Sequence, residues 1–182
     1  MDITQNGIES GADLVELHIT ETIDSSNQKE FRFTVKDNGK GMSSEELKRA
    51  QNPFVTDGIK HPHRKVGLGL PFLIQTAETS GGGWNMESEK GVGTEVTAWF
   101  DLGNFDTPPL GDIPGMFRTV LLFEGSAEVM IKRLKETADE RERIEYEVRK
   151  TELLDALGDL GDTQSLVLLD QYLRSLECAS EE

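Results

Sequence analysis

The sequence predicts an α+β fold, because short runs with alternating apolar residues are interspersed with segments of helical spacing. Clusters of glycine and other turn residues separate these runs. The chain has 182 residues, of which 36% are hydrophobic, a composition typical of globular proteins. We therefore expect one domain of ordinary size with a small appendage.

The expected elements of the first hundred residues follow the order helix, strand, strand, helix, helix, strand, strand. A short helix over residues 1–10 ends at Gly11, a residue type that tolerates the left-handed backbone after a helix. Val15, Leu17 and Ile19 share one face of the next strand, which indicates a half-buried strand. The remaining expected elements are strands over 30–36, 84–89 and 94–102, and helices over 43–51 and from 71 to about 80.

The residues after 102 are expected to form a small C-terminal α+β module, so that the domains are 1–102 and 103–182. A linker over 104–112 is rich in turn residues. Alternation over 128–136 and 144–148 predicts a hairpin, although the Lys, Glu and Arg content also suits a single long helix. A helix with apolar residues at helical spacing is expected over 113–123. Helices with leucine stripes that face the core, Leu153 and Leu154 among them, are expected over 151–157 and 163–176.

The charge of the chain argues against nucleic-acid binding. The formal net charge is −15, from 34 acidic and 19 basic residues, whereas nucleic-acid binders have basic surfaces. Cys178 is a single cysteine and forms no intrachain disulfide, which fits a reducing compartment. No apolar run is long enough to span a bilayer, so we expect a cytoplasmic protein that does not bind membranes.

One motif, Asp37-Asn38-Gly39-Lys40-Gly41-Met42, lies where a predicted strand meets a predicted helix. An acidic residue ends the strand, and two glycines let the backbone approach a flat or bulky group. Taken alone, the motif fits a tight Asn-Gly turn at least as well.

The N-terminal helix carries polar oxygens on neighbouring faces. Asp2 and Asn6 are four residues apart, and Glu9 follows three residues later. Carboxylate and amide oxygens suit a hard cation. The alternative is a short helix with a solvated face.

A third feature is the segment Gly67-Leu68-Gly69-Leu70, which precedes a helix. Exposed N–H groups at such a helix N-terminus bind anions. The preceding loop over 57–65 is basic and contains Lys65, so it is either a lid that contacts phosphates or a solvated loop. The segment matches neither the Walker nor the Rossmann pattern.

Together these motifs resemble the boxes of the GHKL ATPase superfamily, which includes gyrase, heat-shock-90 chaperones, histidine kinases and MutL. Residues 2–6 match the N box, 37–42 the first glycine box, 67–70 the second and 91–94 the last. The resemblance covers residues 1–102. It implies a two-layer α/β sandwich of the Bergerat type, with a mixed sheet and helices on one face.

The resemblance also implies a Mg²⁺-ATP site. Asn6 is then a Mg²⁺ ligand, and Asp37 accepts a hydrogen bond from the adenine amine. Asp2 occupies the position where many members have the glutamate proposed as the general base that orients the attacking water. The remaining nucleotide-binding residues that the resemblance implies are Gly39, Gly41, Met42 and Thr94 around the base, and Lys65, Gly67, Leu68, Gly69 and Leu70 around the phosphates.

The function that follows from the resemblance is Mg²⁺-ATP binding, with weak ATPase activity or nucleotide-dependent regulation of a protein partner through lid closure. The alternatives are a histidine kinase or a serine kinase of the anti-sigma type, and a non-catalytic nucleotide sensor. His18, His61 and His63 do not lie on a long amphipathic helix, which argues against a complete sensor kinase. Besides a complex with a protein partner, a homodimer is a second assembly that this function allows.

Overall fold

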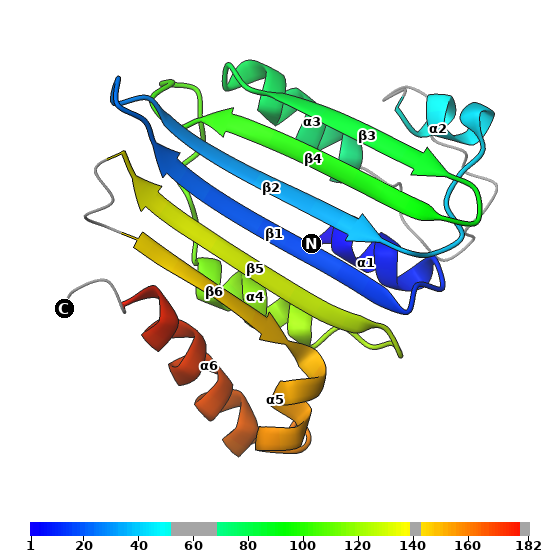
Figure 1. The fold of residues 1–182 in the computed structure, drawn as a ribbon, viewed down its shortest axis with the longest axis vertical. Helices are drawn as coiled ribbons and strands as arrows, with labels where there is room; N and C mark the ends of the chain where they lie inside the picture. Colours follow the sequence, from blue (N-terminus) through cyan, green and yellow to red (C-terminus); the bar gives the residue numbers. More distant parts are fainter. Residues whose placement is uncertain (52–68, 139–142, 179–182) are drawn as a thin grey trace.

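The strands form one mixed sheet. The computed structural model describes residues 1–51, 69–138 and 143–178. Within these ranges six strands pair in the order β3-β4-β2-β1-β5-β6, with β1 and β2 at the centre (Figure 1). Their bounds are β1 Leu14–Ile23, β2 Lys29–Asp37, β3 Gly83–Glu89, β4 Gly93–Asp101, β5 Glu128–Thr137 and β6 Arg143–Arg149.

Helices α1, α3 and α4 lie against one face of this sheet, behind the strands in Figure 1. This arrangement confirms the expected α+β class with a mixed sheet. In the described part of the chain no helix is both long and apolar enough to cross a bilayer. The helix bounds are α1 Asp2–Glu9, α2 Ser44–Ala50, α3 Gly69–Thr79, α4 Ile113–Leu121, α5 Lys150–Leu157 and α6 Thr163–Glu177.

Local signals position several of these ends. Ser43 is the N-cap of α2: its side chain accepts a hydrogen bond from the Glu46 N–H, and the Glu46 carboxylate accepts one from the Ser43 N–H. This capping box satisfies two N–H groups that the helix itself leaves unpaired. Gly11 follows α1 with a φ of +80°, as the sequence predicts.

The C-terminal strands extend the same sheet. β5 pairs in parallel with β1, and β6 pairs antiparallel with β5. The hairpin predicted over 128–148 is therefore confirmed, and the alternative of a single long helix is wrong. The boundary expected after residue 102 falls between β4 and α4, and the residues beyond it contribute strands to the sheet that contains β1.

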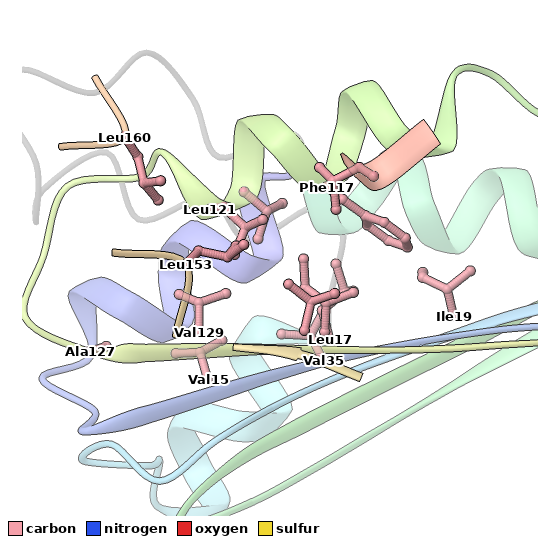
Figure 2. Packing of buried hydrophobic residues seen from close by; sticks show 14 of the residues in the cluster. Val15, Leu17, Ile19, Val35, Phe117, Leu121, Ala127, Val129, Leu153 and Leu160 are labelled. Carbon is pink, nitrogen blue, oxygen red and sulfur yellow. The ribbon is translucent and has the colours of Figure 1, made fainter. Parts of the chain in front are cut away.

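The main core lies between the sheet and its helices. Val15, Leu17 and Ile19 alternate along β1 and are all buried, as the sequence predicts (Figure 2). Burial of each such side chain stabilises the fold by about 1.5–3 kcal/mol. Of the leucines predicted to face the core, Leu154 does not, because it is 39% exposed on α5 while Leu153 is buried. Helix α4 contributes Phe117, Val120 and Leu121, and α6 contributes Leu169 and Leu173.

A smaller cluster fixes α3 against the other half of the sheet. Ala77 of α3 packs with Ala98 and Phe100 of β4. The Phe100 ring lies 6.2 Å from those of Phe31 and Phe33 on β2, centroid to centroid. Such aromatic pairs stabilise beyond their buried area. This contact orients the helix whose first residues enter the candidate site.

One charged side chain lies within the main core. Arg133 is 2% exposed and forms ion pairs with Glu21 of β1 at 2.9 Å and with Glu177 of α6 at 3.1 Å. The Tyr146 hydroxyl donates a hydrogen bond of 2.6 Å to the same Glu177 carboxylate. A buried charge is tolerated only when it is paired in this way. The network therefore ties the end of α6 to three strands.

Replacing Tyr146 with phenylalanine tests this network. Burial, followed by the Glu177 carboxylate, raises the pKa of Tyr146 above its ordinary range. We expect Tyr146→Phe to lower the free energy of unfolding by about 1 kcal/mol at pH 7, measured by urea denaturation. Above a pH of about 10 the tyrosine ionises in the unfolded chain but keeps its proton in the folded one. The difference between wild type and variant should therefore shrink by pH 11.

The matched control is Tyr172→Phe, because Tyr172 is 42% exposed on α6. This variant should stay within about 0.5 kcal/mol of the wild type at pH 7. If Tyr146→Phe were no more destabilising than the control at pH 7, the hydrogen bond to Glu177 would contribute nothing to stability.

Candidate functional site

Residues from several elements line one cavity at the end of β2, Ala50 of α2 and Met86 of β3 among them. It has a volume of about 250 Å³ and lies between α1, the 37–42 turn, the start of α3 and strand β4. Among the residues expected to bind nucleotide, those that line it are Asn6, Asp37, Gly41, Met42, Leu70 and Thr94. The structure thus brings together parts of the chain that are up to 88 residues apart in sequence, from Asn6 to Thr94.

Asp37 is the last residue of β2, and its side chain lies on the core-facing side of the sheet. Val35, two residues earlier, is buried on the same side. Asp37 is 8% exposed, and its Oδ1 accepts hydrogen bonds from the Gly39 N–H at 2.9 Å and the Ser10 hydroxyl at 3.1 Å. One carboxylate oxygen is thus held by the turn and by the end of α1.

Helix α1 approaches this carboxylate closely because Gly7 has no side chain. A Cβ at Gly7 would lie 3.3 Å from the Asp37 Cβ and 3.4 Å from Val15. Five residues before Gly7, at the start of the same helix, Asp2 contacts the start of α3, where a Cβ at Gly69 would overlap its carboxylate. Asp2 and Asn6 are both exposed on α1. The expected general base and the expected phosphate-binding glycine are therefore neighbours.

The opposite wall is held by Ser88 of β3. The Met42 N–H donates a 2.9 Å hydrogen bond to the Ser88 hydroxyl oxygen. That hydroxyl lies 2.9 Å from both the Gly93 carbonyl oxygen and the Thr94 Oγ1. Thr94 in turn pairs with Asp37 across strands β4 and β2. Ser88 thereby links the Met42 backbone to Thr94, the cross-strand neighbour of Asp37.

Sequence reasoning did not single out Ser10, Ser88 or Lys40, which also line or support the cavity. The sequence could have indicated Ser10 as a site residue, because it follows the expected Mg²⁺ ligand Asn6 by one helical turn and so lies on the same helix face. Ser88 had one too, because it follows Met86 by two residues on the same strand face. Lys40 is the one basic residue of the glycine motif.

Three of the expected phosphate-binding residues, Lys65, Gly67 and Leu68, lie outside the described residues. The same holds for His61 and His63. Gly69 and Leu70 are described and form the first residues of α3. His18 lies on β1 with its Nε2 3.0 Å from the Glu16 carboxylate, on the sheet face opposite the core.

Two other cavities are chemically unsuited to a nucleotide. The first, of about 340 Å³, is lined mainly by apolar side chains such as Phe31 and Phe33, which offer few donors to a polyanion. The second, of about 350 Å³, lies on the other face of the sheet, and its lining includes four glutamates, Glu16, Glu87, Glu89 and Glu95, against one lysine, Lys36. Those carboxylates repel phosphate. The 250 Å³ cavity is therefore the candidate site.

The donor set fits Mg²⁺ only together with phosphate oxygens. Within the described ranges no three His, Cys, Asp or Glu side chains come close enough to hold a metal ion. Mg²⁺ commonly keeps several waters and is bound by one or two protein oxygens plus substrate phosphates. The Asn6 amide oxygen and the neighbouring Asp2 carboxylate match this pattern.

The turn between Gly39 and Met42 depends on the absence of a side chain at Gly41. Gly41 has a φ of +56°, and a Cβ there would overlap the Glu89 carbonyl oxygen. We expect Gly41→Ala to lower the free energy of unfolding by about 2–4 kcal/mol, from backbone strain and the overlap together. Thermal or urea denaturation measures this loss.

The control for backbone strain alone is Gly91→Ala. Gly91 has a φ of +82°, but nothing lies within 4 Å of an added Cβ. It should cost about 1 kcal/mol. Equal losses in the two variants would contradict the close packing of Gly41 against β3.

Two solved structures are similar to this chain in part. One is described as "Crystal Structure of N terminal domain of a DNA repair protein"; it has 8% sequence identity and a TM-score of 0.48, and the alignment covers 81% of this chain and 49% of that one. The other is "Aquifex aeolicus MutL ATPase domain complexed with ADP", at 16% identity and a TM-score of 0.43, with coverage of 72% and 57%. The chain thus spans about half the length of these structures.

A family model gives the assignment. The model for histidine kinase-, DNA gyrase B- and HSP90-like ATPases matches residues 1–104, which is more than half of the chain. The matched range contains every residue that lines the 250 Å³ cavity. The chain therefore belongs to the family of histidine kinase-, DNA gyrase B- and HSP90-like ATPases, whose domains bind ATP.

Proposed function

We propose that the protein binds Mg²⁺-ATP in the 250 Å³ cavity, with the adenine against Asp37. The observation that carries this proposal is the buried Asp37 carboxylate, which is held through Oδ1 beside Met42 and Thr94. A carboxylate in a partly apolar cavity is a strong acceptor for an exocyclic amine. Met42, Val35 and Met86 supply apolar surface for a flat base.

The phosphates then extend towards α1 and the first turn of α3. The N-terminus of α3 presents backbone N–H groups and the positive end of a helix dipole, which favour anions. Asn6 supplies an oxygen to Mg²⁺, and Asp2 beside Gly69 orients the water that attacks the terminal phosphate. Lys65, Gly67 and Leu68 are proposed to complete the phosphate contacts.

We further propose that turnover is slow and that nucleotide state is communicated to a protein partner, with a homodimer as one form of assembly. The shared sheet supports such coupling, because β1 lies between the strand that ends in Asp37 and strand β5, from which Arg133 contacts α6. A change at the nucleotide is thus linked to α6 through directly paired elements.

The first test of the site is the variant Asp37→Asn. In this variant the side-chain amide oxygen keeps the hydrogen bonds from the Gly39 N–H and the Ser10 hydroxyl. The amide NH₂ group then faces the adenine amine, and because both groups are donors, no hydrogen bond forms between them. We expect Mg²⁺-ATP affinity, measured by calorimetry, to fall by about 10- to 150-fold, equivalent to about 1.5–3 kcal/mol.

Asp101→Asn is the matched control for this variant. Asp101 ends β4 and accepts a 2.8 Å hydrogen bond from the Gly103 N–H, the same strand-end turn as at Asp37 but outside the cavity. It should bind ATP like the wild type. Unchanged affinity in Asp37→Asn would refute the adenine position.

The second test follows the terminal phosphate with γ-labelled ATP, with and without EDTA. We expect slow, Mg²⁺-dependent release of free phosphate, and at least tenfold slower release in Asp2→Asn with ATP affinity retained. Label on a protein would instead indicate a kinase, and binding without turnover would indicate a nucleotide sensor.

A further inference from the structure

We propose that Ser10 is a positioning residue that makes the site select for a base with an exocyclic amine. This inference rests on the proposed nucleotide site. It concerns how the Asp37 carboxylate is oriented, which the position of Asp37 on β2 does not by itself decide.

Ser10 is the C-cap of α1, with its hydroxyl directed at the strand end. The Ser10 Oγ lies 3.1 Å from the Asp37 Oδ1 and 2.6 Å from the Gly7 carbonyl oxygen. A hydroxyl has one proton, so the two acceptors compete for it or share it. A charged carboxylate makes the stronger hydrogen bond, and a proton turned wholly to Gly7 would leave lone pairs facing Oδ1. The Ser10 hydroxyl is therefore shared between the Gly7 carbonyl oxygen, at the shorter distance, and the Asp37 carboxylate.

The two carboxylate oxygens of Asp37 consequently differ. Oδ1 receives both the Gly39 N–H and the Ser10 hydroxyl. Within the described ranges no donor reaches Oδ2, and no buried side-chain oxygen lacks a partner, so Oδ2 retains access to the cavity. Oδ2 is thus the oxygen left to accept a hydrogen bond from a ligand.

Removal of the Ser10 hydroxyl should leave the turn itself in place. The Lys40 N–H donates to the Ser10 carbonyl oxygen at 3.3 Å, and the Asn38 side chain accepts from the N–H groups of Asp13 and Leu14 at 2.9 and 3.0 Å. These bonds dock the turn on the α1–β1 connection without the hydroxyl. Ser10→Ala should therefore fold. It loses the hydroxyl contacts to Oδ1 and to the Gly7 carbonyl oxygen, and that carbonyl still accepts from the Ser10 N–H at 3.1 Å.

The experiment compares two nucleotides that differ only in the amine. Mg²⁺-ATP and the Mg²⁺ complex of purine riboside 5′-triphosphate, which lacks the exocyclic amine, are titrated into wild type and Ser10→Ala. We expect Ser10→Ala to weaken ATP binding about tenfold and to leave the affinity for the amine-free nucleotide within about twofold. The preference for ATP should thus fall several-fold, which a general loosening of the cavity would not produce.

Ser165→Ala is the matched control. Ser165 is buried and its hydroxyl donates 2.8 Å to the Leu157 carbonyl oxygen, far from the cavity lining. It should reduce thermal stability without altering either affinity. An equal loss for both nucleotides in Ser10→Ala, or no loss for either, would overturn the proposal.

The outcomes also separate this inference from the proposed function. If wild type binds neither nucleotide, or Asp37→Asn binds ATP unchanged, the nucleotide site and the role of Ser10 fail together. If Asp37→Asn weakens ATP binding while Ser10→Ala keeps the full preference for ATP, only the role of Ser10 is overturned.

Discussion

The pairing of β1 with β2 on one side and with β5 on the other is the constraint on which the rest of this structure depends. The antiparallel pairing sets β2 in register, and the parallel pairing brings in a strand from more than a hundred residues away. Side chains alternate between the two faces of a strand, so burial of Val15, Leu17 and Ile19 on β1 fixes which residues of β2 face the helices. A one-residue slip would move Asp37 to the opposite face.

Because this register is fixed, the position of Asp37 at the end of β2 determines the surroundings of its carboxylate. Asp37 is the last residue of β2 on the helix-covered face, where α1 passes without a side chain at Gly7. The carboxylate is therefore removed from most solvent yet open to a cavity on one side. Low solvent access strengthens its hydrogen bonds and makes an unpaired oxygen costly. The orientation that Gly39 and Ser10 impose on Asp37 is the basis of the proposed selection for a base with an exocyclic amine.

In the second half of the chain, the local sequence pattern sets the type of each element, and the tertiary structure sets its partners. Alternation predicted both β5 and β6, but it did not indicate that β5 pairs with β1 and so joins the hairpin to the central sheet. Arg133 lies on the same strand face as Val129 and Ile131, where a charge is expected only if partners reach it. Those partners, Glu21 and Glu177, come from opposite ends of the sequence and meet only in the folded chain.

The sequence by itself determined the order and type of the described elements, and it indicated six of the residues that line the cavity: Asn6, Asp37, Gly41, Met42, Leu70 and Thr94. These depend on residue periodicity, capping and backbone freedom, which act over a few residues. Only the tertiary structure decided that 128–149 extends the central sheet, that Leu154 is exposed, and that Ser10 and Ser88 support Asp37 and Met42. Strand partners and contacts between side chains depend on which surfaces meet when the chain folds. The periodicity of a single segment does not specify these partners.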